Sequence, residues 1–362
     1  MLYFTIHNIF SFSVGGAVSA RMEKFFVQEL GYFQCEKREV DLEIQILPEI
    51  QEPDITFAGR YGKDKQYFYV RDPYSRIVGI FSQSKVIADS RVDAGWLLKD
   101  IVESFMLLHI VPKGYSFLHA SAVEKNNKAI IFTALPQTGK TNFLISLLRK
   151  GYSFLSDEMV IISREGMAYP YPRPLSIYPY NFQANPGLID IVSGNSFTRK
   201  QKIKLVLPLY AMQNWSFIKH PTSLALRVLQ MFLRKAAFRY FLVGPESLGS
   251  TIGKPAIIEK IFLLFAQNTL QDPVLREVQN TKQFAEQLWT NIIAEKGHFF
   301  HETLDALSVG FPEKKAMLGD EYLQRGIEVL HEGCKNILCF ELTISRELPF
   351  QDTFKKCESY FS

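Results

Sequence analysis

The sequence predicts a mixed fold of the α+β or α/β class, with a β-rich N-terminal domain (residues 1–112) and a larger domain (residues 113–362). Two observations carry this prediction. Short runs within residues 1–90 alternate between apolar and polar side chains, which is the period of a half-buried strand. Further on, an apolar strand-like run is followed by a loop and then by a helix-like run, within residues 129–148.

The N-terminal domain shows strand-like runs at residues 40–46, 66–70 and 76–81, separated by Pro, Gly, Asp and Asn. We expect a first strand within residues 1–14 and a turn at Gly15–Gly16. The apolar start has no basic region, so it is not typical of a signal peptide. No residue of this domain indicates catalysis. Its suggested role is substrate recognition or oligomerisation.

Residues 92–110 fit an amphipathic helix. Four apolar residues fall on one face at helical spacing, namely Leu97, Ile101, Phe105 and Leu108. Pro112 and Gly114 then end the helix, and the domain boundary is expected near this point.

A strand, a tight loop and a helix follow one another from Ala129. Residues 129–133 are apolar or β-branched, and the helix carries Phe143, Leu144, Leu147 and Leu148 on one face. This is the context of a phosphate-binding loop, in which backbone N–H groups and a helix N-terminus favour an anion. The candidate nucleotide-binding residues are Ala134, Leu135, Pro136, Gln137, Thr138, Gly139, Lys140, Thr141 and Asn142.

Within this loop, Lys140 would reach the β- and γ-phosphates of a nucleotide and the Thr141 hydroxyl would bind Mg²⁺. The first glycine of the usual motif is replaced by Ala134, which is compatible with the loop if φ there is negative, and Pro136 fixes its own φ near −65°. The alternative is a strand–turn–helix that contains Gly-Lys-Thr by chance.

Two adjacent acids, Asp157 and Glu158, lie in the middle of what reads as a second strand, residues 154–162. A buried acidic pair is costly unless a metal, a cation or a proton neutralises it. Beside a nucleotide site, one carboxylate can hold Mg²⁺ and the other can take the proton of a substrate hydroxyl. The alternative is a solvated strand end.

These motifs together resemble the HPr-serine-kinase-like family. The matching segments are residues 119–123, Ala-Leu-Pro-Gln-Thr-Gly-Lys-Thr at 134–141, residues 151–158 and residues 171–177. The resemblance covers residues 116–177 well and residues 257–265 loosely. The loop is also similar to that of phosphoenolpyruvate carboxykinases, whose nucleotide domain is related.

The resemblance implies an HPr-kinase-like P-loop core with a mixed sheet and flanking helices. It makes Asp157 the general base and Glu158, in place of a second Asp, a helper of the metal. His119 corresponds to the family's histidine and becomes a candidate catalytic residue, with a satisfied core histidine as the alternative. Arg173, between two prolines, is a candidate phosphate contact because a guanidinium forks onto phosphate oxygens, and an ordinary surface arginine is the alternative.

The segment at about residues 181–250 is predicted to be a helical, basic insertion, with a basic run at residues 199–204 and a basic helix at residues 223–243. Gly249 to Pro255 imitates a phosphate loop, but a strand follows it, at residues 257–265, so we interpret it as a turn. Helices are then expected at residues 281–298 and 304–330, and a last strand at residues 339–344.

Composition narrows the class of protein. The 362 residues are 47% hydrophobic and 22% charged, with a net charge of +4, which is too small to indicate nucleic-acid binding. No run has the 18 or more apolar residues of a membrane span. The four cysteines have no zinc spacing and indicate free thiols in the cytoplasm.

The sequence therefore predicts an ATP- and Mg²⁺-dependent kinase for a serine-like hydroxyl of a small molecule, peptide or protein; its relatives also suggest a homo-oligomer. A nucleotide-binding regulatory module without transfer activity is one alternative. Carboxykinase action on oxaloacetate and kinase/phosphorylase action on HPr are two others, for which we recognise no matching substrate segment.

Overall fold

The computed structural model describes residues 1–193, 240–297, 302–311 and 320–361. They form a mixed α/β protein with large mixed sheets and several helices. Spatial contacts divide the chain into two compact units. Unit 1 contains residues 1–119, 159–169 and 278–338, and unit 2 contains residues 120–158, 170–277 and 339–362. The chain therefore passes between the units several times, whereas the sequence predicts one boundary near residue 112.

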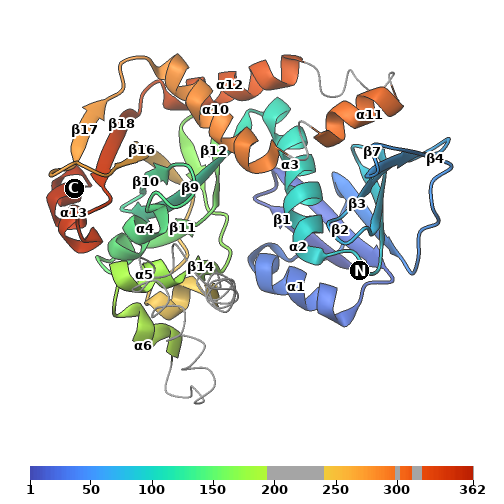
Figure 1. Ribbon diagram of the computed structural model, residues 1–362, viewed down its shortest axis with the longest axis horizontal. Coiled ribbons are helices and arrows are strands. Elements are labelled where there is room, and N and C mark those ends of the chain that lie inside the picture. Colours follow the sequence, from blue (N-terminus) through green and yellow to red (C-terminus); the bar gives the residue numbers. More distant parts are fainter. Residues whose placement is uncertain (194–239, 298–301, 312–319, 362) are drawn as a thin grey trace, which may run out of the picture. The chain divides into compact units, whose positions relative to one another are not determined.

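Unit 1 contains a sheet with the strand order β1-β2-β3-β8-β7-β6-β5-β4, as expected for a β-rich N-terminal region (Figure 1). Strand β3 pairs in parallel with β2 and β8, and the remaining pairs are antiparallel. The strands are β1 (Leu2–Ile6), β2 (Phe10–Gly16), β3 (Leu42–Leu47), β4 (Ile55–Phe57), β5 (Tyr61–Lys63), β6 (Phe68–Arg71), β7 (Ile77–Ser82) and β8 (Lys85–Asp89).

The turn expected at Gly15–Gly16 is wrong. Strand β2 continues through Gly16, and the chain reverses earlier, at His7 and Asn8, which have φ of 52° and 58°. Asn is among the residues that adopt the left-handed conformation most readily, so the turn forms there.

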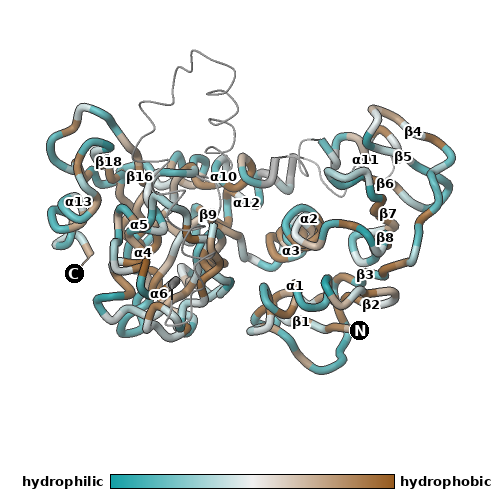
Figure 2. The backbone as a smooth tube through the Cα atoms, turned by 60° about the horizontal axis from the view of Figure 1, so that its bottom comes forward, coloured by the Kyte–Doolittle hydropathy of each residue, from teal (hydrophilic) through white to brown (hydrophobic). Residues whose placement is uncertain are grey.

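The helical stretch predicted after this sheet is present. It comprises α2 (Ala94–Trp96), a π-helical turn (Leu97–Val102) and α3 (Glu103–Ile110). The predicted apolar face is buried, but Glu103 and Ser104 are buried as well. Helix α3 is thus enclosed on more than one side, and its mostly hydrophobic residues are brown in Figure 2.

The other elements of unit 1 come from distant parts of the sequence. The first half of β9 (Tyr115–Lys125) pairs with β12 (Met159–Ser163), which pairs with β13 (Met167–Tyr169). Helices α10 (Thr281–Gly297), α11 (Leu304–Gly310) and α12 (Asp320–Cys334) match the helical stretches predicted there, and α1 (Ala20–Leu30) was not predicted.

Unit 2 is built around β10 (Lys128–Thr133), which pairs antiparallel with β9 and in parallel with β16 (Ala256–Gln267). Strand β16 also neighbours β18 (Leu338–Ser345), and β18 pairs with β17 (Val274–Glu277). The strands predicted near residues 129, 257 and 339 are therefore confirmed. The helices in its described residues are α4 (Lys140–Leu148), α5 (Pro179–Ala184), α6 (Leu188–Ser193) and α13 (Phe350–Cys357).

The predicted basic insertion is described only in part, because residues 194–239 lie outside the described residues. Helices α5 and α6 precede that gap. After it, residues 241–243 form strand β15 (Phe241–Val243), paired with β14 (Leu175–Ile177), so the end of the helix predicted over residues 223–243 is wrong. No helix in the described part of the chain is long and apolar enough to cross a membrane.

Candidate functional site

Two residues of the loop between β10 and α4, Gly139 and Ala134, have informative backbone conformations. Gly139, directly before the helix, has φ of +104°. A Cβ atom there would meet Ile344 Cδ1 at an ordinary 3.6 Å, so glycine is needed for its backbone conformation and not for space. Ala134 is not among the residues with positive φ, which satisfies the condition for replacing the usual glycine.

Aromatic packing fixes both sides of this loop. The ring of Phe132, at the end of β10, stacks on that of Phe143 in the second turn of α4, with centroids 5.2 Å apart. Phe262 of β16 stacks on Phe132 at 5.4 Å, and all three side chains are fully buried. The loop is thus held between a strand and a helix that cannot shift independently.

The Lys140 side chain folds back across the loop. Its Nζ donates to the backbone oxygen of Ala134 at 2.5 Å, and the residue is only 9% exposed. The ammonium group therefore lies within the loop, where the backbone N–H groups of a helix N-terminus also favour an anion.

Asp157 is the residue on which the polar side chains converge. Its Oδ1 accepts from Ser121 Oγ at 2.5 Å, and the Thr141 hydroxyl lies 3.2 Å from both of its carboxylate oxygens. Asp157 is 7% exposed. Residues 121, 141 and 157 come from β9, α4 and the segment between β11 (Ser153–Ser156) and β12, so the fold assembles this cluster from three parts of unit 2.

The cluster changes the acidity of this carboxyl group. Burial raises the pKa of Asp157 to about 6, against the lowering effect of the Ser121 hydrogen bond. The negative charge of Glu158 also raises this pKa, while the charge of Lys140 and the Thr141 hydrogen bond lower it. Asp157 is therefore mostly ionised at neutral pH and can still take up a proton near that pH.

The acidic pair does not lie within one strand, so that prediction is wrong. The strand is broken into β11 and β12, with Asp157 and Glu158 between them. Glu158 has φ of +82°, which no regular strand contains. Its side chain is 38% exposed, and its Oε2 lies 4.0 Å from NH1 of the buried Arg173. The structure thus brings Asp157 to Thr141, and Glu158 to Arg173.

His119 belongs to unit 1, at the last residue before the chain enters unit 2. It lies on β9 opposite Met159, and its Nε2 is 3.6 Å from Oε1 of Glu295 in α10. The side chain is 12% exposed. Its catalytic role stays a prediction.

Sequence reasoning missed several residues around this cluster. Ser121 lies two positions after His119 on the same strand, so both side chains point to the same face of the sheet. A second polar residue on that face was a signal that could have identified Ser121. Asn181 and Asn185, which bond to Asn142, gave no comparable signal because their contact depends on how α4 and α5 pack.

The oxygen donors of the cluster fit Mg²⁺. A hydroxyl and a carboxylate are hard ligands, and Mg²⁺ at phosphate-transfer sites is usually held by one or two carboxylates together with substrate phosphates. The described parts of the chain contain no group of three or more His, Cys, Asp or Glu side chains that could hold a metal ion.

Comparison with known proteins gives no assignment. No protein-family model matches the chain, and no curated protein matches it. A function has to be inferred from the geometry around Asp157.

Proposed function

We propose that unit 2 binds ATP with Mg²⁺ at the loop before α4 and transfers the γ-phosphoryl group to a serine-like hydroxyl of a small molecule, peptide or protein. The observation that carries this proposal is the position of Thr141. At the first turn of the helix after a Gly-Lys-Thr loop, its hydroxyl lies 3.2 Å from both oxygens of a buried carboxylate.

The loop residues would bind the phosphates. Backbone N–H groups at the start of α4 would donate to phosphate oxygens, and Lys140 would exchange its bond to Ala134 for the β- and γ-phosphates. Arg173, the candidate phosphate contact in the sequence, would bind a further phosphate oxygen. Because these groups are held by the packed strand and helix, little reorganisation would be needed when charge develops.

Thr141 and Asp157 are the residues that would hold the metal. Mg²⁺, when bound, neutralises the charge on the phosphate oxygens. The same short distance that joins the two side chains allows both to contact one ion, with the Thr141 hydrogen bond giving way to it.

Asp157 would also serve the acceptor. As the acceptor oxygen forms its bond to the γ-phosphorus and the bond to the β-phosphate oxygen breaks, the hydroxyl proton passes to the Asp157 carboxylate. In the absence of a metal, burial raises the pKa of Asp157 to about 6, which favours uptake of a proton, and a bound Mg²⁺ would lower this pKa. Most of the acceleration would come from positioning and electrostatics.

A second function, nucleotide binding without transfer, is favoured by one observation. Glu158 lies 4.0 Å from Arg173 and is more than a third exposed, whereas the described bonds of Thr141 to the acidic pair go to Asp157. A regulatory module would need the phosphate loop and the metal, but no base.

The deciding experiment is incubation with γ-labelled ATP, Mg²⁺ and cell extract, followed by separation of small molecules from proteins. The Lys140→Ala variant should lose the labelled product, while Lys128→Ala is the matched control because Lys128 lies in the same unit but pairs with Glu259 on the surface. The labelled fraction identifies the class of acceptor. ATP binding by calorimetry without any labelled product would favour the regulatory module, and absence of binding would overturn both functions.

A further inference from the structure

A buried row of amide side chains connects the first turn of α4 with α5. Asn142 Oδ1 accepts from Asn181 Nδ2 at 2.8 Å and from Asn185 Nδ2 at 3.4 Å. The exposed fractions of these three residues are 8%, 1% and 0%. Buried amides are costly unless they are hydrogen-bonded, so an arrangement of this kind is specific in its geometry.

Asn181 has two separate hydrogen bonds in this row. Its Oδ1 accepts from the backbone N–H of Tyr178 at 2.8 Å, which caps the start of α5. Its Nδ2 donates to Asn142. The first bond stabilises α5 itself, and the second fixes α5 relative to α4.

Asn185 extends the row toward the C-terminal helix. Its Oδ1 lies 3.5 Å from Ser146 Oγ of α4 and 3.3 Å from Gln351 Nε2 of α13. Gln351 Nε2 also donates to the backbone oxygen of Ala184 at 2.7 Å. The segment of α5 and Asn185 is thus attached to α4 through Asn181 and Asn185, and to α13 through Gln351.

This row is connected to Asp157 through the first turn of α4. Asn142 directly follows Thr141, whose hydroxyl contacts Asp157. Asn181 directly follows Tyr180, whose pKa is raised first by burial and then by the negative charges of Tyr178 and Asp157. The Tyr180 ring is stacked on that of Tyr178, with centroids 5.4 Å apart.

We propose that Asn181 is a positioning residue for nucleotide binding: its bond to Asn142 fixes the first turn of α4 so that Thr141 faces Asp157. This inference rests on the proposed function. An apolar side chain of similar size could fill the space, but it could not fix the rotation of Asn142 and the turn that carries it.

The experiment measures the dissociation constant of Mg²⁺·ATP by calorimetry, together with the melting temperature. Asn181→Ala should weaken binding about tenfold, the effect of losing the shorter of the two buried hydrogen bonds to Asn142 Oδ1. Asn181→Asp keeps the oxygen that caps α5 and loses the N–H donated to Asn142, so it should weaken binding as well and guards against loss of folding in the alanine variant. Gln351→Ala is the matched control, because it removes the bonds from α13 to Ala184 and Asn185 and leaves both bonds of Asn181 in place.

A purely structural role for Asn181 would lower the melting temperature in the Asn181→Ala and Gln351→Ala variants alike and leave the affinity unchanged. Alanine variants of Asn181 and Asn142, singly and together, form a double-mutant cycle. If Asn181 acts through Asn142, the double variant should bind Mg²⁺·ATP within about twofold of the weaker single variant. Additive losses, or an Asn181→Ala protein with wild-type affinity, would overturn the inference while leaving the proposed function standing. A wild-type protein that does not bind Mg²⁺·ATP would instead overturn both.

Discussion

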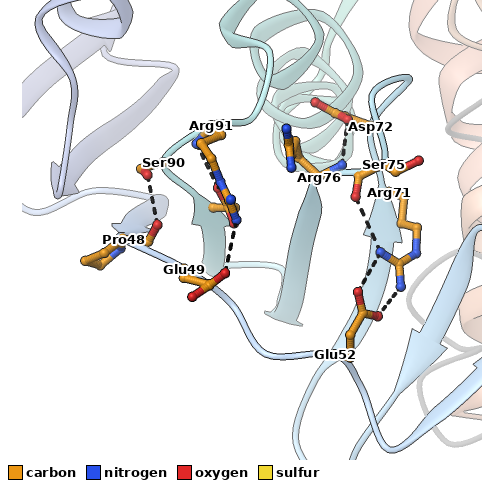
Figure 3. Close-up of polar contacts among 10 residues, drawn as sticks. Pro48, Glu49, Glu52, Arg71, Asp72, Ser75, Arg76, Ser90 and Arg91 are labelled. Carbon is orange, nitrogen blue, oxygen red and sulfur yellow. Dashed lines mark hydrogen bonds and ion pairs between the residues drawn. The ribbon is translucent and has the colours of Figure 1, made fainter.

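Buried carboxylates occur in both units, and their partners differ. In unit 1, Asp72 is 4% exposed and accepts from the backbone N–H groups of Tyr74, Arg76 and Asp93 at 2.7, 2.8 and 3.0 Å (Figure 3 shows the bond from Arg76). In unit 2, the described hydrogen bonds to Asp157 come from the hydroxyls of Ser121 and Thr141.

Asp89 differs from Asp157 because its partner is a positively charged side chain. It is 2% exposed, and Arg91 donates to its two oxygens at 2.9 and 2.8 Å. The hydrogen bonds from Arg91 hold the pKa of Asp89 below its usual range, in spite of burial. Figure 3 shows Arg91 reaching Glu49 as well.

The comparison separates structural from functional carboxylates. Backbone N–H groups donate to Asp72 and the guanidinium of Arg91 donates to Asp89, as befits residues that hold a fold together. Hydroxyl donors can be replaced by a metal or a substrate, and burial leaves Asp157 ready to take a proton. Unit 1 uses its acids to fix turns, whereas unit 2 retains one whose charge is incompletely compensated.

The largest expected effect comes from Asp157→Asn. Phosphoryl transfer should fall about a thousandfold because no carboxylate remains to accept the proton, while Mg²⁺·ATP binding stays within a few-fold. Initial rates with the identified acceptor and calorimetry check this. Loss of nucleotide binding would leave Asp157 its role in holding the metal and overturn its role as the base. Asp72→Asn is the control and should leave transfer intact.

The same comparison predicts opposite effects on stability. The raised pKa of Asp157 means that its neutral form is favoured by folding, so stability is lost as pH rises from about 4 to about 6. Without Mg²⁺ at pH 7, Asp157→Asn should therefore stabilise the protein, by up to about 3 kcal/mol for a shift of about two units. Asp89 has a lowered pKa, so its contribution is present above its unfolded pKa and is lost at acid pH.

Asp89→Asn should accordingly destabilise the protein at pH 7, by about 1 to 3 kcal/mol, because charged hydrogen bonds are lost. Urea unfolding at pH 4 and pH 7 measures both variants. If Asp157→Asn destabilised the protein at pH 7 as much as Asp89→Asn, the distinction between the two carboxylates would be wrong.

Local patterns made most of the fold predictable. The period of the N-terminal strands, the strand–loop–helix around Gly139 and the late helices depend on neighbouring residues, and the structure contains them. The break at Glu158 was not predictable, because Phe154 and Leu155 before the acids and Met159 to Ile162 after them favour one continuous strand. Likewise, Asn181 meets Asn142 only through the packing of α5 on α4, which no local pattern encodes.

A smaller effect is expected from Ser121→Ala. It removes one donor from Asp157, so the rate of transfer should fall about five- to tenfold and the pKa of Asp157 should rise further, because the Ser121 bond lowers it. The pH–rate profile should move its acid limb to higher pH. Ser116→Ala is the matched control: Ser116 is fully buried on the same strand but donates to the backbone of Phe117 in unit 1. Equal losses in both variants would point to packing as the cause.

The smallest effect is expected from Glu158→Gln. The side chain is 38% exposed and 4.0 Å from Arg173, so the ion pair should contribute less than about 1 kcal/mol, and transfer and Mg²⁺ dependence should change less than about threefold. A titration of the transfer rate with Mg²⁺ checks this. A tenfold higher Mg²⁺ requirement would instead make Glu158 the metal ligand that its position after Asp157 suggests, and would mean that the side chain leaves Arg173 when nucleotide binds. The neutral amide is the informative replacement, because it keeps the length of the side chain and removes only the charge that a metal would need.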